Sequence, residues 1–162
     1  MYEDIVEGLC SRREGKRRKA AERIMIEFKK DPCGVVESLL NLPDKCWQYA
    51  YEIFMKDKKT SARCLVRFLS NKRAREALKK LGHDPQKIEE KIKRIKSKIS
   101  LIKNEGWNTD EVESLLRRGM LSASEQKADE IISRINKSKS ISENLKEVKD
   151  YLDSKGIVFE PY

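Results

Sequence analysis

The fold class is decided by residues 81–106, which read LGHDPQKIEEKIKRIKSKISLIKNEG. The apolar residues of this stretch follow one another at intervals of 4, 3, 4 and 3, so they lie on one face of an α-helix; they are Ile88, Ile92, Ile95, Ile99 and Ile102. Just before them, Gly82 suits the end of one helix, while Asp84 and Pro85 suit the cap and first turn of the next. We therefore expect a helix that begins near Pro85 and ends before Gly106. Because its apolar face covers only about two heptads, it predicts an intramolecular helical hairpin and not a free-standing coiled coil.

The composition of the whole chain favours an all-α protein. The chain has 162 residues, of which 7 are glycine and 4 are proline. Together these make up about 7% of the residues, whereas ordinary proteins have about 12%, and turn-rich sandwiches and barrels need more turns. The chain has 36 Lys and Arg against 27 Asp and Glu, a net charge of +9, and 38% of its residues are apolar. It is basic and polar, but it is long enough to bury a core.

Residues 1–82 are expected to form six short helices, each with apolar residues at spacings of three and four. The first two span about 2–13 and 16–30, the third and fourth contain Val35–Leu40 and Trp47–Phe54, the fifth begins at Thr60 or Ser61, and the sixth follows Asn71. Short amphipathic helices bury their apolar faces by stacking in pairs. In length and rhythm these six resemble a HEAT- or armadillo-type array. An irregular helical bundle is the alternative for this half.

Three further helices are expected after the isoleucine helix. Asn108, Ser122 and Ser140 each precede a glutamate by three positions, which approximates the capping box at a helix start. The last of these helices should end at Gly156. The apolar tail, residues 157–162, is expected to be extended and to pack on the body or on a partner.

The charge distribution predicts two subdomains that meet at Gly82. Residues 1–82 contain 20 basic and 12 acidic residues, whereas residues 83–162 contain 16 and 15. We therefore expect a basic multi-helical subdomain over 1–82 and a near-neutral helical subdomain over 83–162.

No residue set of a known catalytic or metal site is evident in the sequence. Cys10, Cys33, Cys46 and Cys64 form no CxxC pair, and His83 is the single histidine, so zinc is not expected. The four cysteines are predicted to be free residues packed in the core. Phosphate-binding glycine loops are absent, and no nucleophile, base or carboxylate pair converges, so we expect no cofactor and, on balance, no enzymatic activity.

Composition also bears on where the protein works. No stretch approaches the roughly 18 uninterrupted apolar residues of a membrane span, and residues 1–10 do not resemble an export leader. A cytoplasmic protein without a membrane partner is expected. Abundant Lys and Glu, 14 Ile and only three Gln are typical of heat-adapted proteins, so we also expect thermostability.

Two clusters of cations are the candidate binding site. The first comprises Arg12, Arg13, Lys16, Arg17, Arg18, Lys19 and Arg23; the second comprises Lys59, Arg63, Arg67, Lys72, Arg75 and Lys79. Their helical spacing places them opposite the apolar faces, and if alternate helices share a row, they form one continuous basic surface. Such stripes attract the phosphate backbone of DNA or RNA without reading its sequence. Trp47, Tyr51 and Phe54 have the spacing of core residues, whereas Tyr49 is expected to point elsewhere.

These patterns favour a non-enzymatic protein that binds nucleic acid through its basic N-terminal half. Residues 83–162 would then contact a protein partner or a second copy. The alternative is an all-α adaptor that presents a concave groove to an acidic protein partner. The third possibility is an enzyme or an enzyme subunit. A further interpretation is that the basic surface only keeps the protein soluble and binds no partner.

Overall fold

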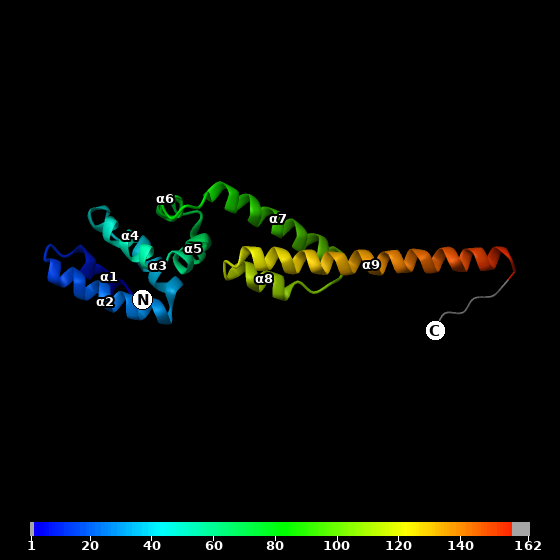
Figure 1. The fold of residues 1–162 in the computed structure, drawn as a ribbon, viewed down its shortest axis with the longest axis horizontal. Helices are drawn as coiled ribbons and strands as arrows, with labels where there is room; N and C mark the ends of the chain where they lie inside the picture. Colours follow the sequence, from blue (N-terminus) through cyan, green and yellow to red (C-terminus); the bar gives the residue numbers. More distant parts are fainter. Residues whose placement is uncertain (1, 157–162) are drawn as a thin grey trace.

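The structure of the protein is a computed structural model, and it describes residues 2–156. All regular elements of these residues are helices, so the predicted all-α class is confirmed (Figure 1). None of the helices within residues 2–156 has a stretch long and apolar enough to cross a membrane. The apolar tail, residues 157–162, lies outside the described residues.

Six α-helices form the N-terminal half. They are α1 (Glu3–Glu7), α2 (Glu14–Lys30), α3 (Pro32–Leu40), α4 (Trp47–Lys56), α5 (Lys58–Leu65) and α6 (Lys72–Lys80), with short 3-10 turns at Gly8–Cys10, Asp44–Cys46 and Val66–Phe68. Local caps set several of these starts. The side chains of Asp31, Asp57 and Asn71 accept hydrogen bonds from backbone N–H groups in the first turns of α3, α5 and α6. Because Asp57 is the cap, α5 begins at Lys58, two or three residues before the expected start at Thr60 or Ser61.

The core of this half is shared by all six helices. Ile24, Phe28, Val36, Leu39 and Phe54 are among its buried residues. α3 packs against α1 and α5. On the other side, α4 contacts α2 and α6 through side chains: the Arg17 guanidinium lies over the Tyr49 ring, and the Tyr51 hydroxyl donates to the carbonyl of Lys80 at 3.3 Å. The helices range from 5 to 17 residues in length, and the HEAT- or armadillo-like array remains a prediction.

The prediction that the four cysteines are free is wrong, because they form two disulfides. Cys10 is bonded to Cys46 and Cys33 to Cys64, with Cα atoms 5.1 and 5.0 Å apart. Cys46 and Cys64 are buried in the core, as expected for this residue type. Each bridge joins residues more than 30 positions apart, which spacing along the sequence could not reveal. Because disulfides persist mainly in oxidising compartments, with hyperthermophile proteins as an exception, the cytoplasmic location remains a prediction.

Three helices form the C-terminal half: α7 (Pro85–Asn104), α8 (Asp110–Arg117) and α9 (Leu121–Ser154). Asp84 caps α7 through its side chain, as predicted. The isoleucine face of α7 divides between the two halves of the molecule. Ile95, Ile99 and Ile102 pack against α8 and α9, whereas Ile88 packs against the N-terminal core.

A helix begins near Ser122, as predicted, with Leu121 as its first residue. The predicted start at Ser140 is wrong, because Ser140 lies inside this helix, α9, which has 34 residues. The segment contains neither glycine nor proline between Leu121 and Lys155, so no residue in it stops a helix once it has begun. The start near Asn108 is confirmed, because its side chain accepts from the N–H of Asp110 at 2.7 Å.

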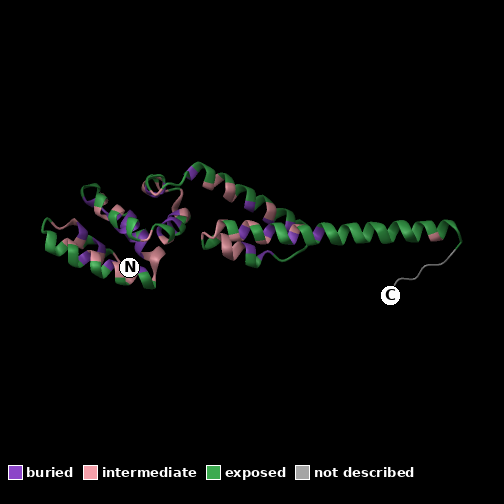
Figure 2. Ribbon diagram, viewed as in Figure 1, coloured by how far each residue is buried: buried purple, intermediate pink, exposed green. Residues whose placement is uncertain are grey.

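The C-terminal part of α9 projects beyond the rest of the molecule (Figure 1). Every residue from 136 to 151 is exposed. Figure 2 shows this segment in green, where it extends beyond the bundle of α7, α8 and the first half of α9. The two halves of the chain have separate apolar cores. They also touch, because Arg75 of α6 forms an ion pair with Glu89 of α7. The subdomain boundary at Gly82 remains a prediction.

Candidate nucleic-acid interface

The first cation cluster lies at and just before the N-terminal end of α2. Six of its seven members are exposed and make no ion pair with any residue of 2–156; they are Arg12, Arg13, Lys16, Arg18, Lys19 and Arg23. The single acidic residue in the first turn of α2 is Glu14. These cations are therefore available to an external anion.

Arg17 differs from its neighbours because its side chain is used within the fold. Its guanidinium donates to the carbonyl of Ser11 at 2.9 Å and lies 4.9 Å from the centre of the Tyr49 ring. The residue is half-buried. Arg17 thus links the start of α2 to α4 and is less free to bind a ligand than Arg18 and Lys19.

The second cluster also divides into free and engaged side chains. Lys59, Arg63, Arg67, Lys72 and Lys79 are exposed, and no side chain of residues 2–156 forms an ion pair with them. Arg75, in contrast, is half-buried and donates to Glu89 of α7 and to the carbonyl of Leu69. Its role is structural, because it joins the two halves of the molecule.

Lys59 and Arg63 border a cleft between α5 and the start of α9. The cleft has a volume of about 750 Å³, and its lining includes the apolar residues Leu78, Ile88 and Met120. All ionisable residues of this lining are basic: Lys59, Arg63, His83 and Lys91. Sequence reasoning missed His83 and Lys91 as members of the basic surface, because they belong to the other half of the chain and only folding brings them to α5.

The aromatic residues of α4 are covered by cations from neighbouring helices. Arg73 lies 5.1 Å from the centre of the Trp47 ring and Lys80 lies 5.0 Å from that of Tyr51, in addition to the pair of Arg17 and Tyr49. Phe54 is fully buried, as predicted, while Trp47 and Tyr51 are partly buried against the core. With their faces occupied, these rings are poorly placed to stack on the bases of a single strand.

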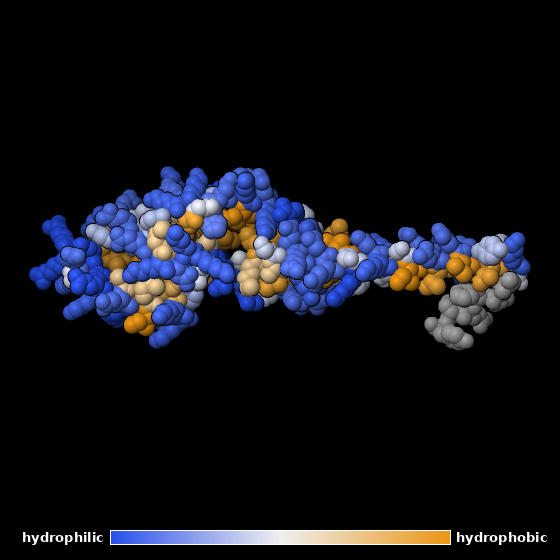
Figure 3. Space-filling model, in the orientation of Figure 1, coloured by the Kyte–Doolittle hydropathy of each residue, from blue (hydrophilic) through white to orange (hydrophobic). Residues whose placement is uncertain are grey.

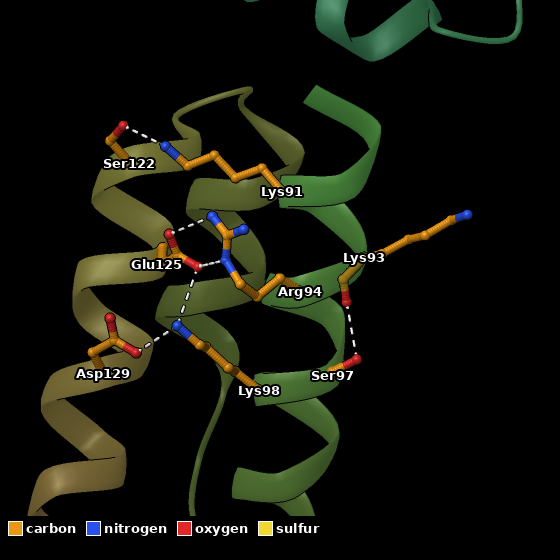
Figure 4. A network of polar contacts seen from close by, with 8 residues as sticks. All are labelled: Lys91, Lys93, Arg94, Ser97, Lys98, Ser122, Glu125 and Asp129. Carbon is orange, nitrogen blue, oxygen red and sulfur yellow. Dashed lines mark hydrogen bonds and ion pairs between the residues drawn. The ribbon is translucent and has the colours of Figure 1, made fainter. Parts of the chain in front are cut away.

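Five of the sixteen cations of the C-terminal half form ion pairs with acids of the described residues. In Figure 4, Glu125 accepts from Arg94 at 2.6 Å and from Lys98 at 3.1 Å, and Lys98 also reaches Asp129 at 2.7 Å. The hydrogen bond from Arg94, followed by the hydrogen bond and charge of Lys98, lowers the pKa of Glu125 to about 2 against the opposing effect of burial. Further pairs join α7, α8 and α9, namely Lys103–Glu113, Lys127–Glu111 and Lys139–Glu105.

The ion pairs add to the difference in net charge between the two halves. In the C-terminal half, ion pairs between α7, α8 and α9 engage five of sixteen cations. In the N-terminal half, the ion pairs of the described residues involve Lys30, Arg73 and Arg75. The positive charge of α2, α5 and α6 therefore faces solvent.

Within residues 2–156, no group of three or more His, Cys, Asp or Glu side chains could hold a metal ion. Comparison with known proteins identifies no relative, since no family model, curated protein or solved structure matches the chain significantly.

Proposed function

We propose that this protein binds nucleic acid through the phosphate backbone, using the exposed cations of α2, α5 and α6. The proposal rests on one observation: eleven of the thirteen candidate cations are exposed and form no ion pair within residues 2–156, the exceptions being Arg17 and Arg75. A cation without an internal partner can replace the condensed counterions of a phosphate, and the release of those ions drives binding.

The contacts expected from this surface carry no sequence information. Its side chains are lysines and arginines of α2, α5 and α6 and of the segments beside them, and the nearby rings are already covered by Arg17, Arg73 and Lys80. Phosphate contacts position a protein on a duplex, whereas base contacts specify the site. We therefore expect affinity that depends steeply on salt and weakly on sequence.

The test is a titration of duplex DNA and of duplex RNA at several salt concentrations. If about five cations engage duplex DNA, log affinity should fall against log salt with a slope near −4.5. The triple variant Arg12→Glu, Arg18→Glu, Lys19→Glu removes three free cations and leaves Arg17 in place. Its slope should be shallower by about 3, because each lost phosphate contact contributes about one unit.

The matched control reverses three exposed cations of α7 instead: Lys87→Glu, Lys93→Glu, Lys96→Glu. These side chains are exposed and make no ion pair within the described residues, and Figure 4 shows Lys93 pointing away from the Glu125 network. The control changes the net charge by the same amount, so it reports any general effect of charge. Equal losses in both variants, or no binding by the parent at about 50 mM salt, where phosphate contacts are strong, would refute the proposal.

The adaptor hypothesis is favoured by a different feature, the basic cleft beside α5. Its lining combines apolar residues with Lys59, Arg63, His83 and Lys91, which suits an acidic protein segment. In that case an acidic peptide should bind and nucleic acid should not compete with it. The variants Lys59→Glu and Arg63→Glu would then abolish peptide binding, while the triple variant in the first cluster would leave it unchanged.

A further inference from the structure

The free end of α9 is an amphipathic helix whose apolar face has no partner among residues 2–156. Its apolar residues Ile141, Leu145, Val148 and Leu152 follow at intervals of 4, 3 and 4, and the first three side chains are 60%, 51% and 49% exposed. Figure 3 shows hydrophobic surface, in orange, along the C-terminal part of α9. We call this row the α9 seam. Because most of the stability of a helix in a protein comes from the packing of its amphipathic face, such a seam is expected to be covered.

The charges around the seam indicate what covers it. Between residues 141 and 155, three lysines stand against four acids: Lys146, Lys149 and Lys155 against Glu143, Glu147, Asp150 and Asp153. The segment is thus close to neutral in a chain of net charge +9. A strongly charged partner would gain little from it, whereas a second copy matches it in both charge and shape.

We propose that the α9 seam pairs with the α9 seam of a second copy, in antiparallel orientation. With Ile141 and Val148 at d positions and Leu145 and Leu152 at a positions, Ile141 packs against Leu152 of the second copy, and Leu145 against its Val148. The flanking e and g positions are Ser142, Asn144, Lys149 and Tyr151, so only one of the four bears a charge and like charges do not face each other.

The antiparallel orientation of the two α9 helices follows from the position of the basic N-terminal half in each copy. α9 begins beside the N-terminal half and ends far from it (Figure 1). A parallel pair would bring two N-terminal halves together, each with 20 basic and 12 acidic residues in 1–82. An antiparallel pair separates them to opposite ends of the dimer, and it also opposes the two helix dipoles.

Two exposed apolar residues at the end of the α7–α8 hairpin extend the interface. Leu101 is 47% exposed and Trp107 39% exposed. Lys139 bonds to Glu105 at 2.5 Å, so this end of the hairpin lies beside residue 139 of α9. In the antiparallel register, residues 152–156 of the second copy lie level with residues 137–141 and hence near Leu101 and Trp107. The dimer interface is therefore larger than the contact between the two α9 seams alone.

The test measures the mass of the full chain in solution by light scattering or sedimentation equilibrium, without nucleic acid. The parent should change from one chain to two between micromolar and millimolar concentrations. Leu145→Lys with Val148→Lys should remain a single chain throughout. The control Glu143→Lys changes the net charge by the same two units on the opposite face of α9 and should dimerise like the parent. A parent that stays monomeric, or a control that fails like the seam variant, overturns the proposal.

Cross-linking tests the orientation. The native cysteines are paired, so a single introduced cysteine is the reactive thiol. An oxidised mixture of Ile141→Cys and Leu152→Cys chains should give linked dimers, while neither variant alone should do so. Linked dimers from Ile141→Cys alone would mean a parallel pair and overturn the antiparallel proposal. None of these measurements involves nucleic acid, so their failure leaves the proposed phosphate binding untouched, and the reverse also holds.

Discussion

Glu125 of α9 is an acid that pairs with two cations of α7. It accepts from Arg94 and Lys98, and its side chain is 18% exposed, whereas that of Arg94 is 54% exposed (Figure 4). Its pKa is lowered from the ordinary 4.5 to about 2, chiefly by the hydrogen bond from Arg94. A depressed pKa in the folded state means that the charged form stabilises the fold. This contribution is complete above pH 4.5 and is lost as the pH falls towards 2.

We predict that Glu125→Gln lowers the free energy of unfolding by about 1–2 kcal/mol at neutral pH, a figure reduced for the exposure of Arg94. The difference between parent and variant should shrink as the pH falls from 4.5 towards 2. Urea unfolding at pH 7 and pH 3 measures it. Glu143→Gln, an exposed glutamate of the same helix, serves as the control and should change stability by less than about 0.5 kcal/mol. A difference that is the same at both pH values would contradict the assignment.

At the scale of elements, glycines end several helices in the left-handed region, and two of them make an informative pair. Gly106 has φ of +78° and Gly119 has φ of +73°. A side chain at Gly106 would meet open space, whereas one at Gly119 would collide with the backbone carbonyl of Arg63 and approach its Cγ at 3.1 Å. The turn between α8 and α9 therefore packs against α5 only because residue 119 has no side chain.

We predict that Gly106→Ala costs about 1 kcal/mol, the usual penalty for a left-handed alanine. Gly119→Ala should cost at least about 1 kcal/mol more, because α5 and the α8–α9 turn must also separate. Thermal or urea unfolding of the two variants compares them directly. Equal losses would show that the contact between Gly119 and Arg63 does not constrain the two halves.

At the scale of the molecule, the presence of two separate apolar cores indicates that a protease can cut the chain between them. Residues 82–84 are exposed and connect the core that contains Leu78 to the core that contains Ile95. Few contacts cross the boundary: Arg75 pairs with Glu89, Ile88 packs on the N-terminal core, and Gly119 lies against Arg63. The connecting segment should therefore open more easily than either core.

Limited digestion with a broad-specificity protease should give stable fragments that end or begin within residues 82–86. Cuts in the free part of α9, at residues 136–151, should also appear, and they should appear faster in the seam variant Leu145→Lys with Val148→Lys than in the parent. Mass spectrometry of the fragments locates the cuts. Protection of residues 82–86 together with cleavage inside residues 88–102 would show that the boundary is misplaced.

Much of the secondary structure was readable from the sequence, because its determinants act within a turn or two. Asp84 caps the helix that it precedes, Asn71 caps α6, and Gly106 ends α7 in the left-handed region. The apolar spacing of α7 likewise identified a buried face. The same local reasoning failed at Ser140, where a capping pattern occurs inside α9. Ser and Glu at the spacing of a capping box can also lie inside a helix. The helix-forming residues on both sides of Ser140 favour a helix that continues through it.

The sequence by itself determined the all-α class, most helix starts and the positions of the cations. Only the tertiary structure decided which cysteines pair, since four cysteines allow three connectivities and the two bridges span 36 and 31 positions. It also separated Arg17 and Arg75, which are held within the fold, from Arg18 and Lys79, which are free. The physical reason is the range of the interactions. Caps and periodicity involve residues a few positions apart, whereas disulfides, ion pairs and contacts of cations with aromatic rings join helices that only the folded chain brings together.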